Sequence, residues 1–177
     1  AFRNMPAYFQ HRGLETDEPG KIDKTPRDVF AENLDSDGSA KIAARDPKNR
    51  RRVIVTLLAE GGKPARHTPE LRKLLARVAV EAEEIVLIAE EEFFARKNNE
   101  VILDEFRAAH PKVLCRAYPY STFSLVVPNH VAVPRHRIIS PEDTEKILER
   151  ERCGKRDLAH ISASDPPVAW LGGVPGQ

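Results

Sequence analysis

The sequence predicts a two-part chain, with an α/β domain over residues 1–127 and a small α+β module over residues 128–177. Short apolar runs of strand length alternate with amphipathic helical patterns in the first part, which is the arrangement of a sheet covered by helices. In the second part, Pro and Gly recur between Asn129 and Gln177 around little apolar sequence. That composition favours a small module whose backbone is shaped by turns.

Chain length, cysteine content and the length of apolar runs limit the classes of protein to which this chain can belong. A chain of 177 residues can hold one ordinary domain or two small ones. Cys115 and Cys153 fall one in each predicted part, which favours reduced thiols over a disulfide framework. No apolar run approaches the roughly 20 residues of a membrane helix, and no signal-peptide pattern stands at the front, so we expect no membrane partner.

The charge is nearly balanced along the whole chain. The formal net charge is +1; residues 1–127 hold 21 basic and 20 acidic side chains, and residues 128–177 hold 7 of each. A protein that binds free DNA by counterion release is usually more basic. The balance therefore favours a DNA contact that is weak or shared within a larger assembly.

The first elements are helical. Phe2, Met5 and Phe9 recur at helical spacing, and Gly13 follows as a stop, which predicts a helix that ends at Arg12. A second helix is predicted from Pro26 to Leu34 with Thr25 as its cap.

A polar stretch from Asp35 to Asn49 predicts a loop that ends in a basic run. The basic side chains of this run are Lys48, Arg50, Arg51 and Arg52. Because charge runs usually face water, a solvated loop that enters a strand is favoured. The alternatives are a localisation signal or a phosphate contact near DNA.

Two continuous apolar runs, Val53–Leu58 and Ile85–Ile88, predict strands buried on both faces. Between them Thr68-Pro69-Glu70 begins a helix. Its inward residues are Leu71, Leu74, Leu75 and Val78.

After the second run, a helix is predicted from Asn99 to Ala109. Its predicted inward residues are Val101, Ile102, Leu103 and Phe106. A third strand follows, at either Val113–Tyr118 or Thr122–Val127. This βαβαβ rhythm predicts a mainly parallel sheet covered by helices.

The C-terminal module begins with a helix start at Ser140-Pro141-Glu142-Asp143. Ser140 can accept a hydrogen bond from a free helix amide, Pro is tolerated at the first position, and acids suit the positive helix end. Ile147 and Leu148 supply an inward face, and we expect the helix to fray near Cys153-Gly154.

The module ends with a second, shorter helix. Leu158–Ile161 predicts an edge strand or an extended connector, and Asp165-Pro166 then starts a helix of one to two turns. Gly172 or Gly173 ends that helix. It carries Trp170, the single Trp of the chain, which we expect to anchor a small core.

This C-terminal pattern resembles the assembly module of the common subunit of eukaryotic nuclear RNA polymerases, a module that stands alone as a small polymerase subunit in archaea. The matching positions are His130, Val133, Pro134, Leu158, Ile161, Asp165, Pro166, Trp170, Gly172, Gly176 and Gln177. The family usually has Tyr where Trp170 stands, Pro and Arg where Ala159 and His160 stand, and Arg where Ala169 stands. The family also continues into β-strands beyond Gln177, so we expect the sequence to be an incomplete copy.

The resemblance implies a fold and a role for each part. The N-terminal part would be a jaw domain with a restriction-endonuclease-like fold near downstream DNA. The module would dock on the largest polymerase subunit and assist assembly. Nucleotide addition and its magnesium ions would belong to the two largest subunits, so this chain would have no cofactor, metal, catalytic residue or small-molecule substrate. Its location would be the nucleus, or the nucleolus if it serves polymerase I.

Other motifs in the sequence have competing interpretations. Glu60-Gly-Gly-Lys63 lacks the first Gly and the hydroxyl of a phosphate loop, because Pro64 follows Lys63, so a Gly turn is favoured. Glu83 and Glu84 precede a predicted strand and Glu90–Glu92 follow it, without the spacing of a nuclease metal site. The six His residues show no metal-ligand spacing with either Cys, and His130 is interpreted as structural.

Three hypotheses remain from the sequence. The first is a non-catalytic RNA polymerase subunit. The second is a stand-alone metal-dependent nuclease or nucleic-acid-processing enzyme on the same α/β core. A third is a general adaptor that carries the small C-terminal module.

Overall fold

A computed structural model describes residues 2–17, 34–47, 50–59, 62–174 and 176. It divides into two compact units, Ala1–Leu125 and Val126–Gln177. The helix predicted over residues 26–34 lies outside the described residues except for Leu34, which forms an isolated antiparallel bridge with Ala40.

The larger unit is a mixed α/β fold around a five-stranded sheet of order β1-β2-β3-β4-β5. Its strands are β1 (Glu15–Thr16), β2 (Ser39–Arg45), β3 (Arg52–Leu58), β4 (Glu84–Ala89) and β5 (Leu114–Pro119). Its helices are η1 (Phe2–Asn4), α1 (Met5–Arg12), α4 (Lys63–Arg66), α5 (Thr68–Ala79), α6 (Glu91–Ala95), α7 (Lys97–Ala109) and η2 (Tyr120–Phe123).

The pairing of the strands corrects one prediction. β3, β4 and β5 are parallel, but β2 pairs antiparallel with both β1 and β3, so the sheet is mixed and not mainly parallel. The difference arises because residues 39–45, predicted as part of a loop, form β2 and pair with β3 at every position from Ser39↔Leu58 to Arg45↔Arg52. A buried neighbouring strand therefore overrides the weak β-propensity of a stretch rich in Ala and charge.

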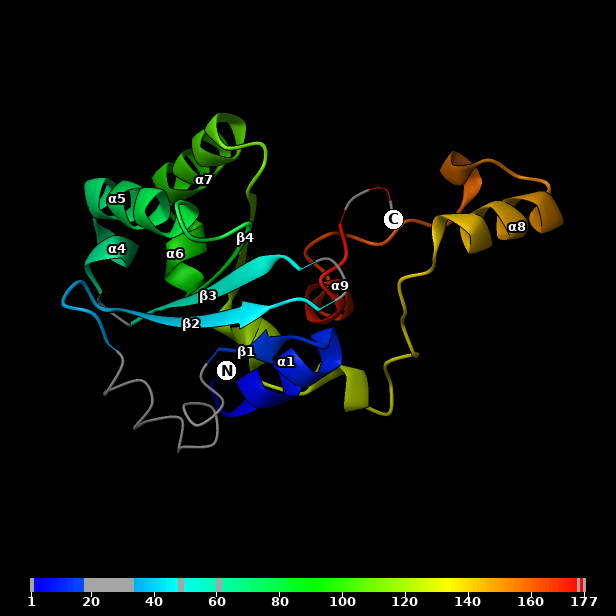
Figure 1. Ribbon diagram of the computed structural model, residues 1–177, viewed down its shortest axis with the longest axis horizontal. Coiled ribbons are helices and arrows are strands. Elements are labelled where there is room, and N and C mark those ends of the chain that lie inside the picture. Colours follow the sequence, from blue (N-terminus) through cyan, green and yellow to red (C-terminus); the bar gives the residue numbers. More distant parts are fainter. Residues whose placement is uncertain (1, 18–33, 48–49, 60–61, 175, 177) are drawn as a thin grey trace. The chain divides into compact units, whose positions relative to one another are not determined.

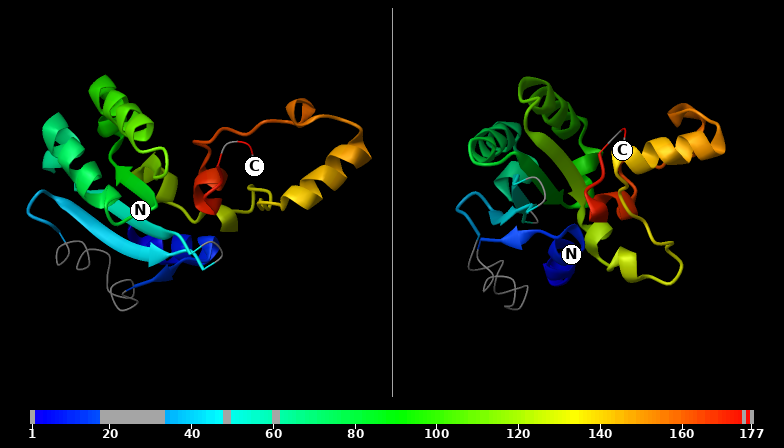
Figure 2. Two further views of the ribbon diagram at one scale, coloured as in Figure 1. Left: turned by 45° about the horizontal axis from the view of Figure 1, so that its top comes forward. Right: turned by 45° about the vertical axis from the view of Figure 1, so that its right-hand side comes forward.

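Helices cover the sheet on both faces, as Figures 1 and 2 show, with α4–α7 on one side and α1 on the other. The first side holds a continuous core that includes Ile54 and Leu58 of β3, Ile85 and Leu87 of β4, and the apolar stripe of α5. β3 and β4 are buried almost throughout, which confirms the predicted strands. The inward residues predicted for α5 are also confirmed as buried.

The inward face of α7 differs at one position from the prediction. Ile102, Leu103 and Phe106 are buried, but Val101 is 53% exposed. The fourth inward residue is Asn99, whose Nδ2 donates to Phe93 O at 3.0 Å. Residues 99, 102, 103 and 106 share one helix face, whereas residue 101 points about 150° away from the centre of that face.

On the opposite face, α1 packs through aromatic side chains. Tyr8 meets Phe123 edge-on with ring centroids 5.0 Å apart, and Tyr118 of β5 meets the same ring at 6.0 Å. Asn4 Nδ2 donates to Phe123 O and Ser124 O, each at 2.9 Å. Gly13, with φ +66°, ends α1 as predicted.

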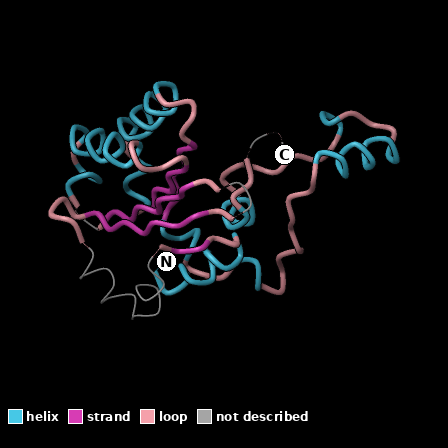
Figure 3. The backbone as a smooth tube through the Cα atoms, viewed as in Figure 1, coloured by secondary structure: helices cyan, strands magenta, loops and turns pink. Residues whose placement is uncertain are grey.

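The smaller unit contains η3 (Val127–Asn129), α8 (Pro141–Glu151), η4 (Lys155–Asp157) and α9 (Pro166–Leu171), and Figure 3 shows loops between them. The third strand is β5, at the first of the two predicted positions; part of the second position is the 3-10 helix η2. Cys115 and Cys153 are free thiols, and burial raises the pKa of Cys115 to about 11. Within the described residues, no helix combines the length and apolar character needed to cross a membrane.

Candidate docking module

The start of α8 is built as the sequence predicts. Ser140 Oγ accepts from Asp143 N at 3.1 Å, and Thr144 Oγ1 donates to Ser140 O at 2.9 Å. Hydrogen bonds from its own backbone amide and from Ser140 lower the pKa of Glu142. The acidic first turn therefore suits the positive end of the helix.

The end of α8 differs slightly from the prediction. The helix ends at Glu151, before the expected Cys153-Gly154, because Arg152 adopts the left-handed conformation with φ 50°. Arg152 N donates to Glu149 O and Cys153 N donates to Leu148 O, both at 3.2 Å. These bonds satisfy the last carbonyls of the helix in the manner usually reserved for Gly.

α9 is a short helix set between Pro and Gly. Pro166 opens it and Gly172, with φ +69°, closes it, which confirms the predicted start and the first of the two predicted stops. Gly172 N donates to Ala169 O at 3.2 Å, and Gly173 N donates to Val168 O at 3.0 Å. α9 packs against η3, so the segment just before His130 lies beside a helix that comes much later in the chain.

The module has little interior of its own. In its described part, Ala169 and Trp170 are the buried residues, and no residue of α8 is buried. The predicted inward residues Ile147 and Leu148 are half-buried. Large apolar side chains stand in water instead: Val131 is 99% exposed, Ile161 51% and Ile138 45%. The exposure of Val131 and Ile138 could not be recognised from the sequence.

The other residues of the predicted C-terminal motif lie in turns or in an extended connector. His130 opens a turn, in which its carbonyl accepts from Val133 N at 3.0 Å and its Nδ1 from Ala132 N at 3.2 Å. His136 Nδ1 lies 2.7 Å from Pro134 O. Gly176 has φ +91°, and Gln177 lies outside the described residues. Leu158–Ile161 is an extended connector and not a strand.

The predicted basic run belongs to the other unit. Lys48 lies outside the described residues, Arg50 and Arg51 are exposed in the turn between β2 and β3, and Arg52 opens β3. Arg50 has φ 59°, and Asp46 N donates to Arg51 O at 2.9 Å. Arg52 Nη2 lies 4.0 Å from Asp17 Oδ2. The described part of the run, from Arg50 to Arg52, therefore lies at the tip of a hairpin.

The carboxylates that could suggest a nuclease site are separated by the sheet. Glu83 and Glu84 lie at the start of β4, and Glu90–Glu92 lie past its end, so about 20 Å of strand separates them. Glu84 is buried in an ion pair with Arg12. Among the described residues, no group of three or more His, Cys, Asp or Glu side chains could hold a metal ion.

Comparison with known proteins identifies the class. Residues 125–177 match the family described as "RNA polymerase Rpb5, C-terminal domain". The chain is 38% identical over 158 residues to the DNA-directed RNA polymerase RPB5 homolog of African swine fever virus, a match that covers 88% of this chain and 77% of the relative. It is 48% identical over 49 residues to DNA-directed RNA polymerase subunit Rpo5 of Thermococcus kodakarensis, which covers 28% of this chain and 60% of the relative.

These relatives are subunits of DNA-directed RNA polymerases. The chain belongs to the RPB5 family of such subunits. The resemblance inferred from the C-terminal motif is therefore confirmed, and the family favours a polymerase subunit over the stand-alone nuclease.

Proposed function

We propose that this chain is a non-catalytic subunit of a DNA-directed RNA polymerase whose residues 128–177 dock on the largest subunit. One observation carries the docking role: the module buries Ala169 and Trp170 alone in its described part and leaves Val131 and Ile161 exposed. A module with a small interior and exposed apolar side chains becomes more stable when a partner covers those side chains. The residues proposed to shape or contact that interface are His130, Val133, Pro134, Asp165, Pro166, Trp170, Gly172, Gly176 and Gln177.

The proposal gives residues 1–127 the role of a jaw domain with a restriction-endonuclease-like fold near downstream DNA. A mixed five-stranded sheet covered by helices on both faces supports this assignment. The separation of the carboxylates along β4 supports a non-catalytic role. We therefore assign the magnesium-dependent chemistry to the two largest subunits.

We propose that the chain resides where its polymerase works, which is the nucleus for a nuclear enzyme and the nucleolus for polymerase I. The relatives reported above come from a virus and an archaeon. The compartment is therefore assigned through the partner polymerase and not through a signal in this chain.

The docking role is tested by mixing the purified full chain with the largest subunit of its polymerase and measuring complex formation by size-exclusion chromatography. Ile161→Asp places a charge on an exposed apolar side chain of the module and should weaken binding at least about tenfold. Val80→Asp is the matched control, because Val80 is 87% exposed in the other unit. Equal binding by both variants, or magnesium-dependent DNA cleavage by the chain alone, would overturn the proposal.

A further inference from the structure

Ser140 lies in a short sequence that combines two features recognised by serine/threonine protein kinases. Pro141 follows it, and Arg137 and Arg135 stand three and five positions before it. Kinases distinguish their substrates partly by charge patterns, in which carboxylates of the kinase pair with Arg before the acceptor. Pro directly after the acceptor is a second such feature, because its φ is fixed and it has no N–H.

The combination of these two features is specific to Ser140 within the chain. No other Ser or Thr in the sequence has a basic residue three positions before it. Thr25 and Thr68 also precede Pro, but an apolar residue stands three positions before each of them. Arg before the acceptor and Pro after it therefore occur together at Ser140 alone.

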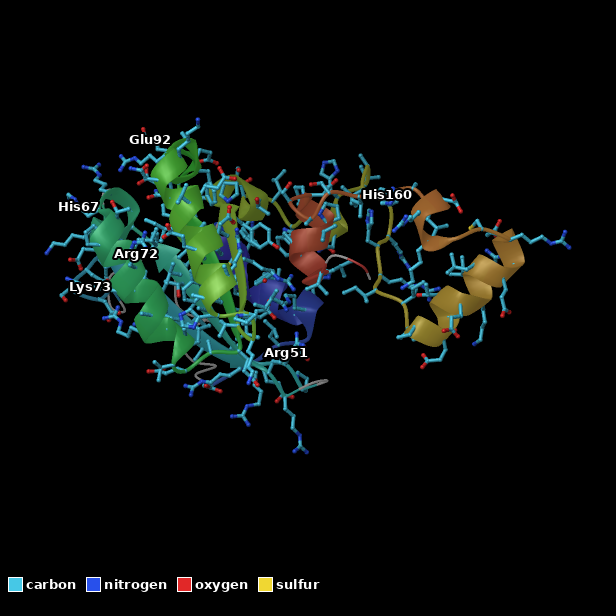
Figure 4. The ribbon with its side chains drawn as sticks, turned by 90° about the horizontal axis from the view of Figure 1, so that it is seen from above. Arg51, His67, Arg72, Lys73, Glu92 and His160 are labelled. Carbon is cyan, nitrogen blue, oxygen red and sulfur yellow. The ribbon has the colours of Figure 1, made fainter. Side chains whose placement is uncertain are left out.

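The backbone before Ser140 has the extended form in which a groove takes up a peptide. Residues 134–140 belong to neither helix nor strand, and Figure 4 shows this segment as a yellow trace that leads into α8, with side chains on both sides. Ser140 itself has φ −70° and ψ 158°. Arg135, Arg137 and Ser140 are all exposed. The segment can therefore enter a kinase groove without the loss of a buried side chain.

The two arginines are available for such a contact. Within the part of the chain that the structure describes, neither Arg135 nor Arg137 forms an ion pair. Arg150, by contrast, pairs with Glu151 at 2.8 Å. The start of α8 needs only the hydroxyl of Ser140 as its cap. The helix cap therefore accounts for the serine and not for the arginines before it.

We propose that Ser140 is phosphorylated by a serine/threonine kinase that recognises both Arg and Pro, and that the phosphate opposes docking of the module. The kinase transfers the γ-phosphoryl group of ATP to Ser140 Oγ. The bond between the γ-phosphorus and the bridging oxygen breaks, a bond between that phosphorus and Oγ forms, and ADP leaves. The hydroxyl proton passes to the catalytic base of the kinase. The effect on docking rests on the proposed function.

A phosphate on Ser140 lies beside apolar side chains that docking would cover. Ile138 is 45% exposed and stands two positions before Ser140, and Ile139 is half-buried. Phosphoserine carries a charge of about −1.5 to −2 at pH 7, and such a charge opposes binding in an apolar interface because it must lose its water. Glu142 and Asp143, in the first turn of α8, add like-charge repulsion. Phosphorylation of the free chain should therefore reduce its assembly.

The first test incubates the purified full chain with Mg²⁺, ATP and a purified kinase of this Arg- and Pro-directed type, and locates the phosphate by tandem mass spectrometry. We expect phosphate at Ser140. Arg137→Gln should lower kcat/KM at least about tenfold, because a charge-assisted contact with the kinase is lost. Arg156→Gln removes the same charge from another exposed Arg of this unit and should change kcat/KM by less than about twofold. Equal rates for the two variants, or phosphate mainly at Ser162 or Ser164, would overturn the proposal.

The second test measures binding of the labelled full chain to the largest subunit by fluorescence anisotropy, before and after treatment with the kinase. Phosphorylation should weaken binding at least about tenfold. Ser140→Asn keeps a capping side chain but has no hydroxyl to modify, so its binding should not change on treatment. If the untreated wild-type chain fails to bind that subunit, the proposed function fails. If it binds equally well with and without phosphate on Ser140, the inferred effect of the phosphate is wrong.

Discussion

At the residue scale, buried charges hold α1 to the sheet. Arg12 donates to Glu84 Oε1 at 2.8 Å and to Oε2 at 3.0 Å, and its guanidinium also donates to Tyr8 Oη at 3.0 Å. Arg116 Nε lies 3.5 Å from Glu84 Oε1. Burial opposes the charge of Arg12, but Tyr8 and Glu84 together raise its pKa. Burial raises the pKa of Tyr8 as well, so this phenol stays neutral.

We predict that Glu84→Gln lowers the free energy of unfolding by about 3–5 kcal/mol, because two buried guanidinium groups lose their shared carboxylate. Urea unfolding followed by far-UV circular dichroism measures the loss. Glu81→Gln, which changes an exposed carboxylate nearby, should stay within about 0.5 kcal/mol of the wild type. A loss below about 1 kcal/mol for Glu84→Gln would show that the pair adds little.

A second set of charges connects α5 to the turn before β2. Asp37 Oδ1 accepts from Ser39 N at 3.0 Å and from Ser39 Oγ at 2.7 Å, and Arg77 Nη2 donates to Asp37 Oδ2 at 2.8 Å. Burial raises the pKa of Asp37, but these hydrogen bonds and the charge of Arg77 outweigh it, so the net shift is downward. The ionised form is therefore favoured by the fold.

We predict that Asp37→Asn lowers stability at neutral pH and that its difference from the wild type disappears in acid. Because the folded pKa is depressed, the contribution is full above the ordinary Asp value of about 3.9 and is lost as pH falls through the folded value. Urea midpoints measured at pH values from about 7 down to about 2 test this. Asp104→Asn, in an exposed i,i+3 pair, is the control and should cost a few tenths of a kcal/mol at most. If Asp37→Asn were still as much less stable than the wild type at the lowest pH as at neutral pH, the stabilising role given to the ionised Asp37 carboxylate would be wrong.

At the element scale, α8 combines a well-formed start with a strained end. Ser140 caps its first turn, whereas Arg152 takes a left-handed conformation that suits Gly better. The helix has no buried residue, so its stability within this chain depends on such local features.

We predict that Arg152→Gly stabilises α8 by about 0.5–1 kcal/mol, because Gly adopts the left-handed conformation without a Cβ clash. Amide hydrogen exchange of residues 144–151 measures the gain as slower exchange. Glu149→Gly places the same residue inside the helix and should instead lower its stability by about 1 kcal/mol. Faster exchange in Arg152→Gly would show that the side chain, and not the backbone, sets the helix end.

At the scale of the whole molecule, the two units differ in how much apolar surface they bury. The α/β unit has a core that extends through β3, β4, α5 and α7. The module buries Ala169 and Trp170 in its described part. Since burial of apolar surface is the main stabilising term, the module should be the less stable unit.

We predict that Trp170 fluorescence reports unfolding at lower urea than far-UV circular dichroism, which follows mainly the α/β unit. Ile88→Val, in the buried strand β4, should lower the circular dichroism midpoint and leave the fluorescence midpoint unchanged. The largest subunit at about 100 times its dissociation constant should stabilise the module by about 2.7 kcal/mol. Coincident transitions in the free chain would mean that the two units unfold together.

The sequence by itself determined the features that act over a few residues. Pro141 and Ser140 start α8, Gly172 ends α9, and the run Val53–Leu58 forms a strand, because each depends on local backbone geometry or on a continuous apolar stretch. The same local Pro and Gly pattern indicated the family. Because Pro and Gly act on the backbone conformation at their own positions, this pattern could be recognised without knowledge of the fold.

Only the tertiary structure decided the features that need a partner distant in the chain. β2 forms because β3 pairs with it. Glu84 is a buried structural charge because it pairs with Arg12, which lies 72 residues before it, and Arg96 donates to Arg66 O, which lies 30 residues before it. Likewise Asn99 is buried with its amide donating to Phe93 O, a contact made by the folded α6 and α7. Strand pairing and side-chain burial depend on residues that are distant in the sequence and meet only in the folded chain. A short stretch of sequence therefore cannot predict them by itself.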